Sequence, residues 1–570
     1  MRRLLILLSV SCSAAMAQEP DAVVSRTYDL GGLGLPAPSL RRGDEALPRP
    51  LGTHASVSYE SEEGDLEAGE ADGAEGFAEL VGYLVGETKW HSLSGGFLRV
   101  HATVAQHVSI QKALDTLVHQ GGTPLEIEIR SYSIPMAAID DGLRRELSQA
   151  TAMEEAMVQR LAALDREQGR LSGTCHVMPG SWGRYDSVIR SSYLPDFDVE
   201  IAQGRAIADP VVGVVREGIA LAIRPHLLED GSVLARVIAS SGNLERPLRR
   251  FRAGTTDLGD LELADFRGAG VSTELVLRPN AYSAVVVAAP HSARGGSWEI
   301  LLLRLRAVPD PAPASNLAIL PLGALSSQDF SLRYGWTDDG RMRIAQIESD
   351  RRFEAQDLMG WIGAQESEGV VLPVAWLHGG ALLVVGDTAS AKPLRTALAA
   401  LQSSILQPVR LNLRLLAVGP QTVPDETTPA AGLLSLPLLA GRTAGCSTYL
   451  SREHVADYDV EVAQDARIGD PIVRAAYGGL FANLRLNRTG PRAYRLRLEL
   501  RIAGVDDEIR EISHGAKEVG PVQDLATRTL LLSPTLDLQA GAAKVTELGA
   551  DPTDPTGARR LFLLATLLDG

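Results

Sequence analysis

The chain has 570 residues, of which 45% are hydrophobic and 22% are charged. At about 150 residues per domain, this composition predicts a folded protein of roughly four domains. The formal net charge of -16 and the aromatic content of 5% argue against general nucleic-acid binding, because an acidic surface repels phosphates and few rings can stack on bases.

The first 17 residues have the pattern of a secretory signal peptide. Arg2 and Arg3 precede an apolar run at 4–10, and small residues lead to Ala17. We expect cleavage after Ala17 and an exported protein in the periplasm or cell envelope. An alternative is lipidation of Cys12, which follows the apolar run. No later apolar stretch reaches the roughly 18 residues of a membrane helix, so we expect none; association with the outer membrane stays open.

The next segment, residues 18–75, lacks long apolar patterns and ends in an acidic, glycine-rich run. We expect it to be largely flexible, with a strand at 26–30 that docks elsewhere. Residues 76–135 predict a small mixed α/β domain. Two stripes at helical spacing alternate there with two short strands, an order that suggests helices on one face of a little sheet.

An amphipathic helix is predicted within residues 136–171, because apolar residues from Leu143 to Leu164 recur at steps of three and four. We expect it to pack on its own domain; a partner-binding or coiled-coil role is the alternative. Residues 172–308 predict a β-rich domain, in which alternation around Leu221 precedes a turn at Asp230-Gly231 and a second strand.

A second copy of this plan follows. Residues 196–212, DFDVEIAQGRAIADPVV, match residues 457–473, DYDVEVAQDARIGDPIV, at 10 of 17 positions without a gap. Weaker matches lie upstream, 96–100 on 380–384, and downstream, 275–279 on 530–534. A match of this quality indicates an internal duplication.

The fold prediction is therefore an α+β chain of two tandem repeats, each a small mixed α/β domain followed by a β-rich domain. The remaining segments are assigned in chain order as a linker with strands at 309–352, the second small domain at 353–418, a loop at 419–445 and the second β-rich domain at 446–570.

Each repeat holds one cysteine, Cys175 and Cys446. An exported protein meets an oxidising compartment, so a disulfide between the halves is one interpretation and two buried or free thiols is the other. Two cysteines without neighbouring ligands do not make a zinc site.

Few residues suggest chemistry. Two alternating carboxylate rows could bind calcium, or form a solvated strand face: Asp196, Asp198 and Glu200, and Asp457, Asp459 and Glu461. Histidines gather in the small domains, without the spacing of a zinc hydrolase: His91, His101, His107, His119 and His378. No nucleophile elbow, P-loop or dinucleotide motif occurs in the sequence. We therefore predict a non-enzyme, and assign no catalytic, cofactor or metal residues.

The small domain and the hairpin resemble a known family. Residues 80–117, with Trp90, the Gly95-Gly96 pair and the strand FLRV, resemble the small periplasmic domain that precedes the core of bacterial secretins. Residues 218–225, GIALAIRP, followed by the turn at 229–233, resemble the core hairpin of that family. Secretins are the outer-membrane channels of type II and type III secretion and of type IV pili.

This resemblance implies an envelope protein that assembles with itself or with protein partners and acts in protein secretion. The chain departs from the family in its duplication, in Leu486 where the motif has proline, and in the missing V-P-x-x-G-x-x-P-x-x-G signature. A monomeric periplasmic or surface binding module is the alternative function, followed by a hydrolase whose residues come from distant positions.

Overall fold

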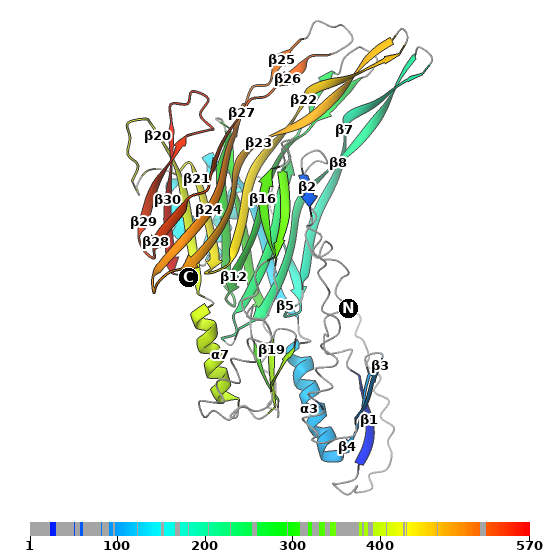
Figure 1. The fold of residues 1–570 in the computed structure, drawn as a ribbon, viewed down its shortest axis with the longest axis vertical. Coiled ribbons are helices and arrows are strands. Elements are labelled where there is room, and N and C mark those ends of the chain that lie inside the picture. Colours follow the sequence, from blue (N-terminus) through cyan, green and yellow to red (C-terminus); the bar gives the residue numbers. More distant parts are fainter. Residues whose placement is uncertain are drawn as a thin grey trace.

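In the computed structural model, large antiparallel β-sheets make up most of the described chain, which has few helices (Figure 1). Within these residues, no helix has both the length and the apolar character needed to cross a membrane. The structure describes residues 23–29, 51, 57–60, 81, 90–94, 97–121, 124–149, 153–165, 172–180, 182–202, 205–228, 230–252, 259–292, 295–307, 317–321, 330–336, 342–348, 375–378, 381–385, 391–405, 407–425, 428, 430–463, 466–513 and 520–569.

The larger sheet has nine strands. From one edge to the other, eight of them follow the order β27 (Thr527–Leu532), β24 (Ala493–Val505), β23 (Ala466–Arg488), β22 (Thr443–Ala463), β12 (Asp265–Leu277), β9 (Val233–Leu244), β8 (Arg205–Leu227) and β7 (Gly183–Ala202). The ninth, β28 (Thr535–Gln539), pairs with β24 beside β27. In β24, Leu496 and Leu498 are buried while the alternating Arg495 and Arg497 are exposed, which is the pattern of a strand with one covered face.

The second sheet has eight strands. Their order is β29 (Ala543–Ala550), β30 (Arg560–Asp569), β20 (Pro408–Val418), β21 (Gly432–Leu439), β13 (Tyr282–Ser292), β14 (Gly295–Ala307), β5 (Leu125–Pro135) and β6 (Ser172–Val177). The two sheets pack face to face over one apolar core that draws on both halves of the chain, from Ile127 to Leu567.

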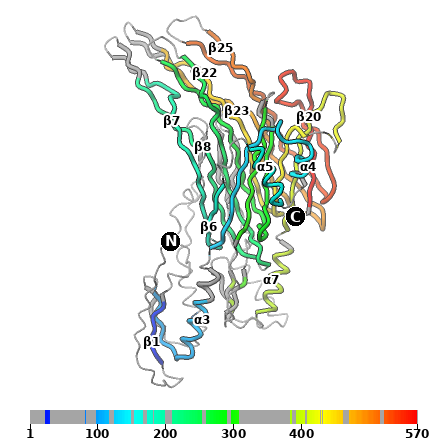
Figure 2. Tube along the Cα trace, turned by 180° about the vertical axis from the view of Figure 1, so that it is seen from behind, coloured from blue at the N-terminus to red at the C-terminus, as the bar shows by residue number. Residues whose placement is uncertain are grey.

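The outer face of the eight-stranded sheet is covered by η2 (Met136–Ala138) and the helices α4 (Asp141–Gln149) and α5 (Glu155–Leu164) (Figure 2). β14 therefore has two buried faces: Trp298 packs toward the helices and Leu301 toward the other sheet. The single helix expected across 136–171 is two helices in the structure. Between them the chain is extended at Met153, whose backbone N–H donates to the carbonyl of Tyr282 at 2.9 Å.

Two small three-stranded sheets, each near one helix, lie below the sandwich in Figure 1. One holds β1 (Val23–Asp29), β4 (Phe97–Thr103) and β3 (Trp90–Ser94), with α3 (Val104–Gly121) after β4. The other holds β15 (Leu317–Pro321), β19 (Ala381–Val385) and β18 (Ala375–His378), with α7 (Lys392–Ile405) after β19. β1 is the docking strand expected near residue 26.

The last strand assigned to each small domain belongs to the sandwich instead. β5 pairs with β14 and β6, and β20 pairs with β21 and β30. Likewise, the segment 419–445, expected as a loop, contains β21. Most residues of β5 and β21 are buried, so these strands lack the alternation that marks a half-exposed strand.

Another small sheet combines β16 (Phe330–Trp336), β17 (Met342–Glu348) and β2 (Val57–Glu60), and β16 lies against β22 and β23. Long hairpins extend beyond the sandwich at its other end (Figure 1). These fingers are β7–β8 and β22–β23, and beside them lie the short hairpins β10 (Arg249–Arg252) with β11 (Asp260–Leu263) and β25 (Arg510–Ile512) with β26 (Val522–Asp524).

The expected β-rich character is thus confirmed. The mixed α/β character is confined to the small sheets with their helices and to the helices on the eight-stranded sheet.

Candidate assembly interface

The first and second halves of the chain meet in the middle of the nine-stranded sheet. β12 pairs with β22 from Asp265 opposite Arg452 to Ser272 opposite Gly445. The packing there requires glycine at 268, because a Cβ on that residue would lie 2.4 Å from the ring of Tyr449. The halves are therefore joined by a continuous ladder of backbone hydrogen bonds and by an aromatic ring seated on a glycine.

The same two halves also meet in the eight-stranded sheet, where β13 pairs with β21 from Val286 opposite Ser435 to Ala288 opposite Leu433. The hydroxyl of Thr273 donates to the carbonyl of Pro437 at 2.8 Å and so links the two sheets. Each half therefore contributes to both layers at the junction, and we call these two ladders together the internal junction.

A buried carboxylate fixes the base of the fingers. Glu453 on β22 has no exposed surface, and its two oxygens accept hydrogen bonds from the hydroxyl of Tyr193, at 2.9 Å, and from the backbone N–H of Ala264, at 3.0 Å. Because Tyr193 belongs to β7 and Ala264 precedes β12, one side chain ties three separate stretches of chain. Such a buried acceptor stays bound to its donors, since losing one of them leaves a buried oxygen without that hydrogen bond.

A second buried carboxylate lies on the other finger. Glu217 on β8 accepts hydrogen bonds from Arg246, from the backbone N–H of Leu244 at 3.1 Å and from the hydroxyl of Ser191 at 3.3 Å. Burial raises the pKa of Glu217, but the hydrogen bonds from Arg246 and Leu244 outweigh burial and leave the pKa below its usual value. Glu217 is therefore ionised at neutral pH.

Among the residues that the structure describes, each sheet also ends in strands that pair on one side only. In the nine-stranded sheet these are β7 at one edge and β27 with β28 at the other; in the eight-stranded sheet they are β6 and β29. Apolar residues at the two edges of the larger sheet are incompletely covered. Tyr185 on β7 and Leu532 on β27 are only partly buried against the core, and the side chain of Leu531 is 65% exposed.

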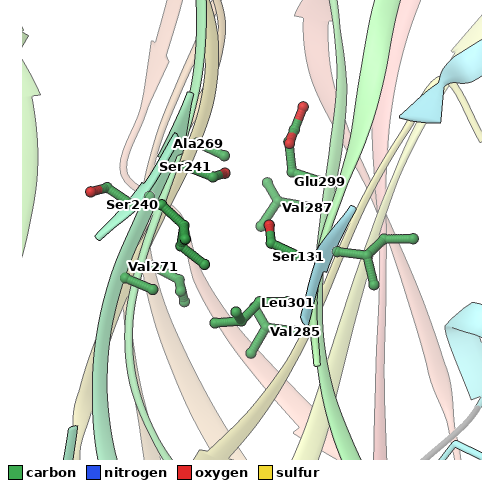
Figure 3. A pocket seen from close by; sticks show the side chains of 13 residues that line it. Ser131, Ser240, Ser241, Ala269, Val271, Val285, Val287, Glu299 and Leu301 are labelled. Atoms are coloured by element: carbon green, nitrogen blue, oxygen red, sulfur yellow. The ribbon is translucent and has the colours of Figure 1, made fainter. Parts of the chain in front are cut away.

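A small cavity lies between the two sheets and is lined by residues of both (Figure 3). It has a volume of about 30 Å³, and polar side chains such as Ser131, Ser241 and Glu299 share its wall with valines and isoleucines. This volume is enough for one water molecule and too small for an organic ligand. The Ser133 hydroxyl donates to Glu299 at 2.8 Å, yet burial dominates and raises the pKa of Glu299 above its usual value.

The carboxylate rows proposed for calcium lie on the fingers. Asp196 and Asp457 each accept a hydrogen bond from the next backbone N–H, at 2.9 Å, and Asp198 and Asp459 are exposed. Burial, and to a lesser degree the charge of Asp198, raises the pKa of Asp196. The side chains of Glu200 and Glu461 lie outside the described residues, and among those described no three ligand-type side chains form a group able to hold a metal ion.

The histidines do not gather at one point within the described part of the chain. His107 is buried and structural: its ring bonds the hydroxyl of Tyr28 at 2.6 Å and the carbonyl of Val24 at 3.0 Å, which holds β1 on α3. His101 is partly buried on β4. The side chains of His91, His119 and His378 lie outside the described residues.

Cys175 and Cys446 are both free and buried in the inter-sheet core, on β6 and β22. Of the two interpretations, the structure therefore has thiols instead of a disulfide. Burial raises the pKa of both, so both are protonated at neutral pH.

Sequence patterns did not point to the residues that matter most here. Glu453, Glu217 and Glu299 stand in no motif, and the partners of Glu453 come from positions 193 and 264. One signal was present: the matching residues 196–202 and 457–463 lie at the ends of β7 and β22, in the two fingers.

Comparison with known proteins gives only a distant likeness. No family model and no curated protein sequence matches the chain. Solved structures similar to it include three secretins. The InvG secretin domain of the Salmonella SPI-1 injectisome is 10% identical and covers 44% of this chain and 85% of its own, with a TM-score of 0.20. The type II secretin GspD of E. coli K12 is 12% identical and covers 47% and 81%, with a TM-score of 0.18. The type IV competence pilus secretin PilQ of V. cholerae is 9% identical and covers 42% and 84%, with a TM-score of 0.16. Because the identities and TM-scores are this low, we base the function on the contacts of this chain.

Proposed function

We propose that the protein is a non-enzymatic, exported envelope protein made of two tandem secretin-like halves. In this proposal it assembles with itself or with other envelope proteins through its sheet edges and takes part in protein secretion. The strand order carries the proposal. Each sheet contains the same run of four strand positions twice, once from each half of the chain. In the larger sheet β12, β9, β8 and β7 of the first half correspond, in that order, to β27 with β28, β24, β23 and β22 of the second. In the smaller sheet β13, β14, β5 and β6 correspond in the same way to β29, β30, β20 and β21.

The backbone of the two finger hairpins supports this correspondence. Gly218 lies opposite Val188, and Gly479 lies opposite Tyr449. Both glycines have positive φ, 130° and 139°, and a Cβ on either would lie about 2 Å from a carbonyl oxygen of the partner strand. An unusual backbone state at the matching point of both hairpins favours one shared plan.

The strand pairings of the larger sheet also favour a different downstream match between the two halves from the one that sequence similarity suggests. Leu275 lies opposite Ala235, and Leu536 lies opposite Leu496, at the same distance from the paired glycines. We therefore equate Leu275 with Leu536, six positions beyond the Leu530 that sequence similarity suggests. The chance recurrence of Leu-x-Leu-x-Pro accounts for the difference.

Self-assembly is supported by the apolar side chains that are incompletely covered at the edges of the larger sheet, Tyr185, Leu531 and Leu532. Strands with free backbone N–H and C=O groups and partly buried apolar side chains are templates for further pairing. The signal peptide expected at 1–17 supports export, and the acidic balance of the chain is consistent with protein partners in place of nucleic acid.

The test is the mass of the purified exported chain in solution, measured by light scattering with and without mild detergent. We expect a defined multimer. A single-chain mass under both conditions would reject self-assembly and favour the alternative function, a monomeric binding module.

A further inference from the structure

We propose that the outer face of the larger sheet binds the carboxylates of an acidic protein segment through two exposed arginines, Arg485 and Arg497. This inference deepens the proposed function, on which it rests for the presence of protein partners. It adds the chemistry that such a partner presents and the place where it binds.

The two arginines, called here the arginine pair, stand side by side on neighbouring strands of the second half. Arg485 of β23 lies directly opposite Arg497 of β24. The residues that alternate with them, such as Leu484 and Leu496, belong to the core between the sheets, so both arginines lie on the outer face, where they are exposed. Like charges directly opposite each other destabilise a sheet, so the pair costs stability unless an anion binds both guanidinium groups.

The first half contains the same pair with its charge balanced. In the correspondence set by the paired glycines, Arg224 and Arg236 take the places of the arginine pair, and they too lie opposite each other. The next residue in that row is Glu274 of β12, opposite Arg236. Its two carboxylate oxygens lie 3.7 Å from Arg236 and 3.2 Å from Arg442, and these three residues are buried. A carboxylate is therefore the group that neutralises this row of arginines in the first half.

The second half lacks that carboxylate. Because Leu275 corresponds to Leu536, the counterpart of Glu274 is Thr535 of β28, which lies opposite Arg497. Among the described residues, neither member of the arginine pair has an ion-pair or side-chain hydrogen-bond partner. The row that is neutralised inside the first half is thus left for an anion from outside in the second.

The acidic side chains beside the pair are engaged with other groups. Asp537 pairs with Arg495 at 2.8 Å, and Glu499 accepts a hydrogen bond from Asn483 at 3.3 Å. Each free guanidinium can donate two parallel hydrogen bonds to one carboxylate. Since the matching row of the first half holds a carboxylate, we assign the site to a protein segment that carries Asp or Glu, and not to phosphate.

Binding of a fluorescein-labelled hexaglutamate peptide to the full chain tests this assignment, with fluorescence anisotropy at low salt as the measurement. Arg485→Gln should weaken binding about threefold, and Arg485→Gln with Arg497→Gln about tenfold, because exposed ion pairs are individually weak. Arg488→Gln is the control of equal charge on the same strand. Its guanidinium donates to the carbonyls of Gly490 and Pro491, at 2.9 and 3.1 Å, so its loss should leave the affinity unchanged.

A second pair of variants uses the comparison between the halves. Thr535→Glu places a carboxylate where Glu274 stands in the first half, so it should compete with the peptide and weaken binding as far as Arg485→Gln does. Thr535→Gln has a similar size without the charge and should bind the peptide like the unmodified chain.

The outcomes separate this inference from the proposed self-assembly. Absence of saturable peptide binding, or equal losses from Arg485→Gln and Arg488→Gln, overturns the inference and leaves a multimeric mass in solution unaffected. Arginine-dependent binding of phosphatidylglycerol vesicles without binding of hexaglutamate overturns it in favour of a phosphate ligand. A single-chain mass rejects self-assembly, whereas arginine-dependent peptide binding in the same sample supports the site.

Discussion

The strongest single test of the finger geometry is Gly218→Ala. Gly218 has a φ of 130°, and a Cβ there would lie 2.0 Å from the carbonyl oxygen of Ser187 on the paired strand. The clashing atom belongs to the backbone, so no side-chain rotation relieves it. β7 and β8 must move apart locally, which weakens the neighbouring ladder hydrogen bonds.

The expected cost follows from these two effects. An alanine held at a positive φ costs about 1–2 kcal/mol, and the loss of one or two ladder hydrogen bonds adds about 0.5–1.5 kcal/mol each. We therefore expect Gly218→Ala to lower the free energy of unfolding by about 3 kcal/mol. Gly231→Ala is the matched control: its φ is 78° and no atom lies within 4 Å of the added Cβ, so it should cost only about 1 kcal/mol.

Urea unfolding followed by tryptophan fluorescence measures both variants. Buried Trp298 lies in the sandwich and reports its loss. If the two variants lost the same free energy within about 0.5 kcal/mol, the close approach of the strands would not constrain this position, and the argument from the paired glycines would fail.

Three further outcomes are expected. Glu299→Gln should raise the urea midpoint at pH 8 but not at pH 4. Burial raises the pKa of Glu299, so the stability that its neutral form provides is lost as the pH rises from the unfolded pKa through the folded pKa. An equal effect at both pH values would contradict a buried neutral carboxyl. Glu217 has the opposite pH dependence. Since its folded pKa is lowered, its contribution to the free energy of unfolding is present above the unfolded pKa of about 4.3 and is lost on acidification below it. Glu217→Gln should therefore flatten the fall in stability between pH 5 and pH 3, and an unchanged slope would refute the pairing with Arg246. In a Cys12→Ser chain without reducing agent, a maleimide should leave Cys175 and Cys446 unlabelled in the native protein and label both in guanidinium; a disulfide, or fast labelling of the native protein, would contradict their buried, reduced state.

Periodicity in the sequence predicts the half-exposed strands and fails for those buried on both faces. The alternation around Leu221 marks β8, and the turn at Asp230-Gly231 marks the hairpin that continues into β9. β21 has no alternation because one face meets the other sheet and the opposite face is also covered. β5 alternates apolar and charged residues from Leu125 to Arg130 and is predicted as a strand, but local periodicity does not show that its partners are β14 and β6 of the sandwich.

The interface residues were beyond sequence analysis for a different reason. The role of Glu453 depends on Tyr193, which is 260 positions away along the chain, and the free state of Cys175 and Cys446 depends on which sheet each belongs to. Long-range pairing of this kind leaves no local pattern. The similar segments 196–202 and 457–463 were visible because their likeness is local, and both lie in the fingers.

The mixing of both halves in each sheet has a consequence for the order in which the chain can fold. β12 is complete by residue 277, but its partner β22 begins at residue 443. Until that strand arrives, the first half has an open inner edge as well as its outer one. Long-range pairing of this kind is slow to form and prone to aggregation while it is incomplete. The first half therefore depends on the second for the cover of its inner edge, and the sandwich cannot close before the residues after 443 are available.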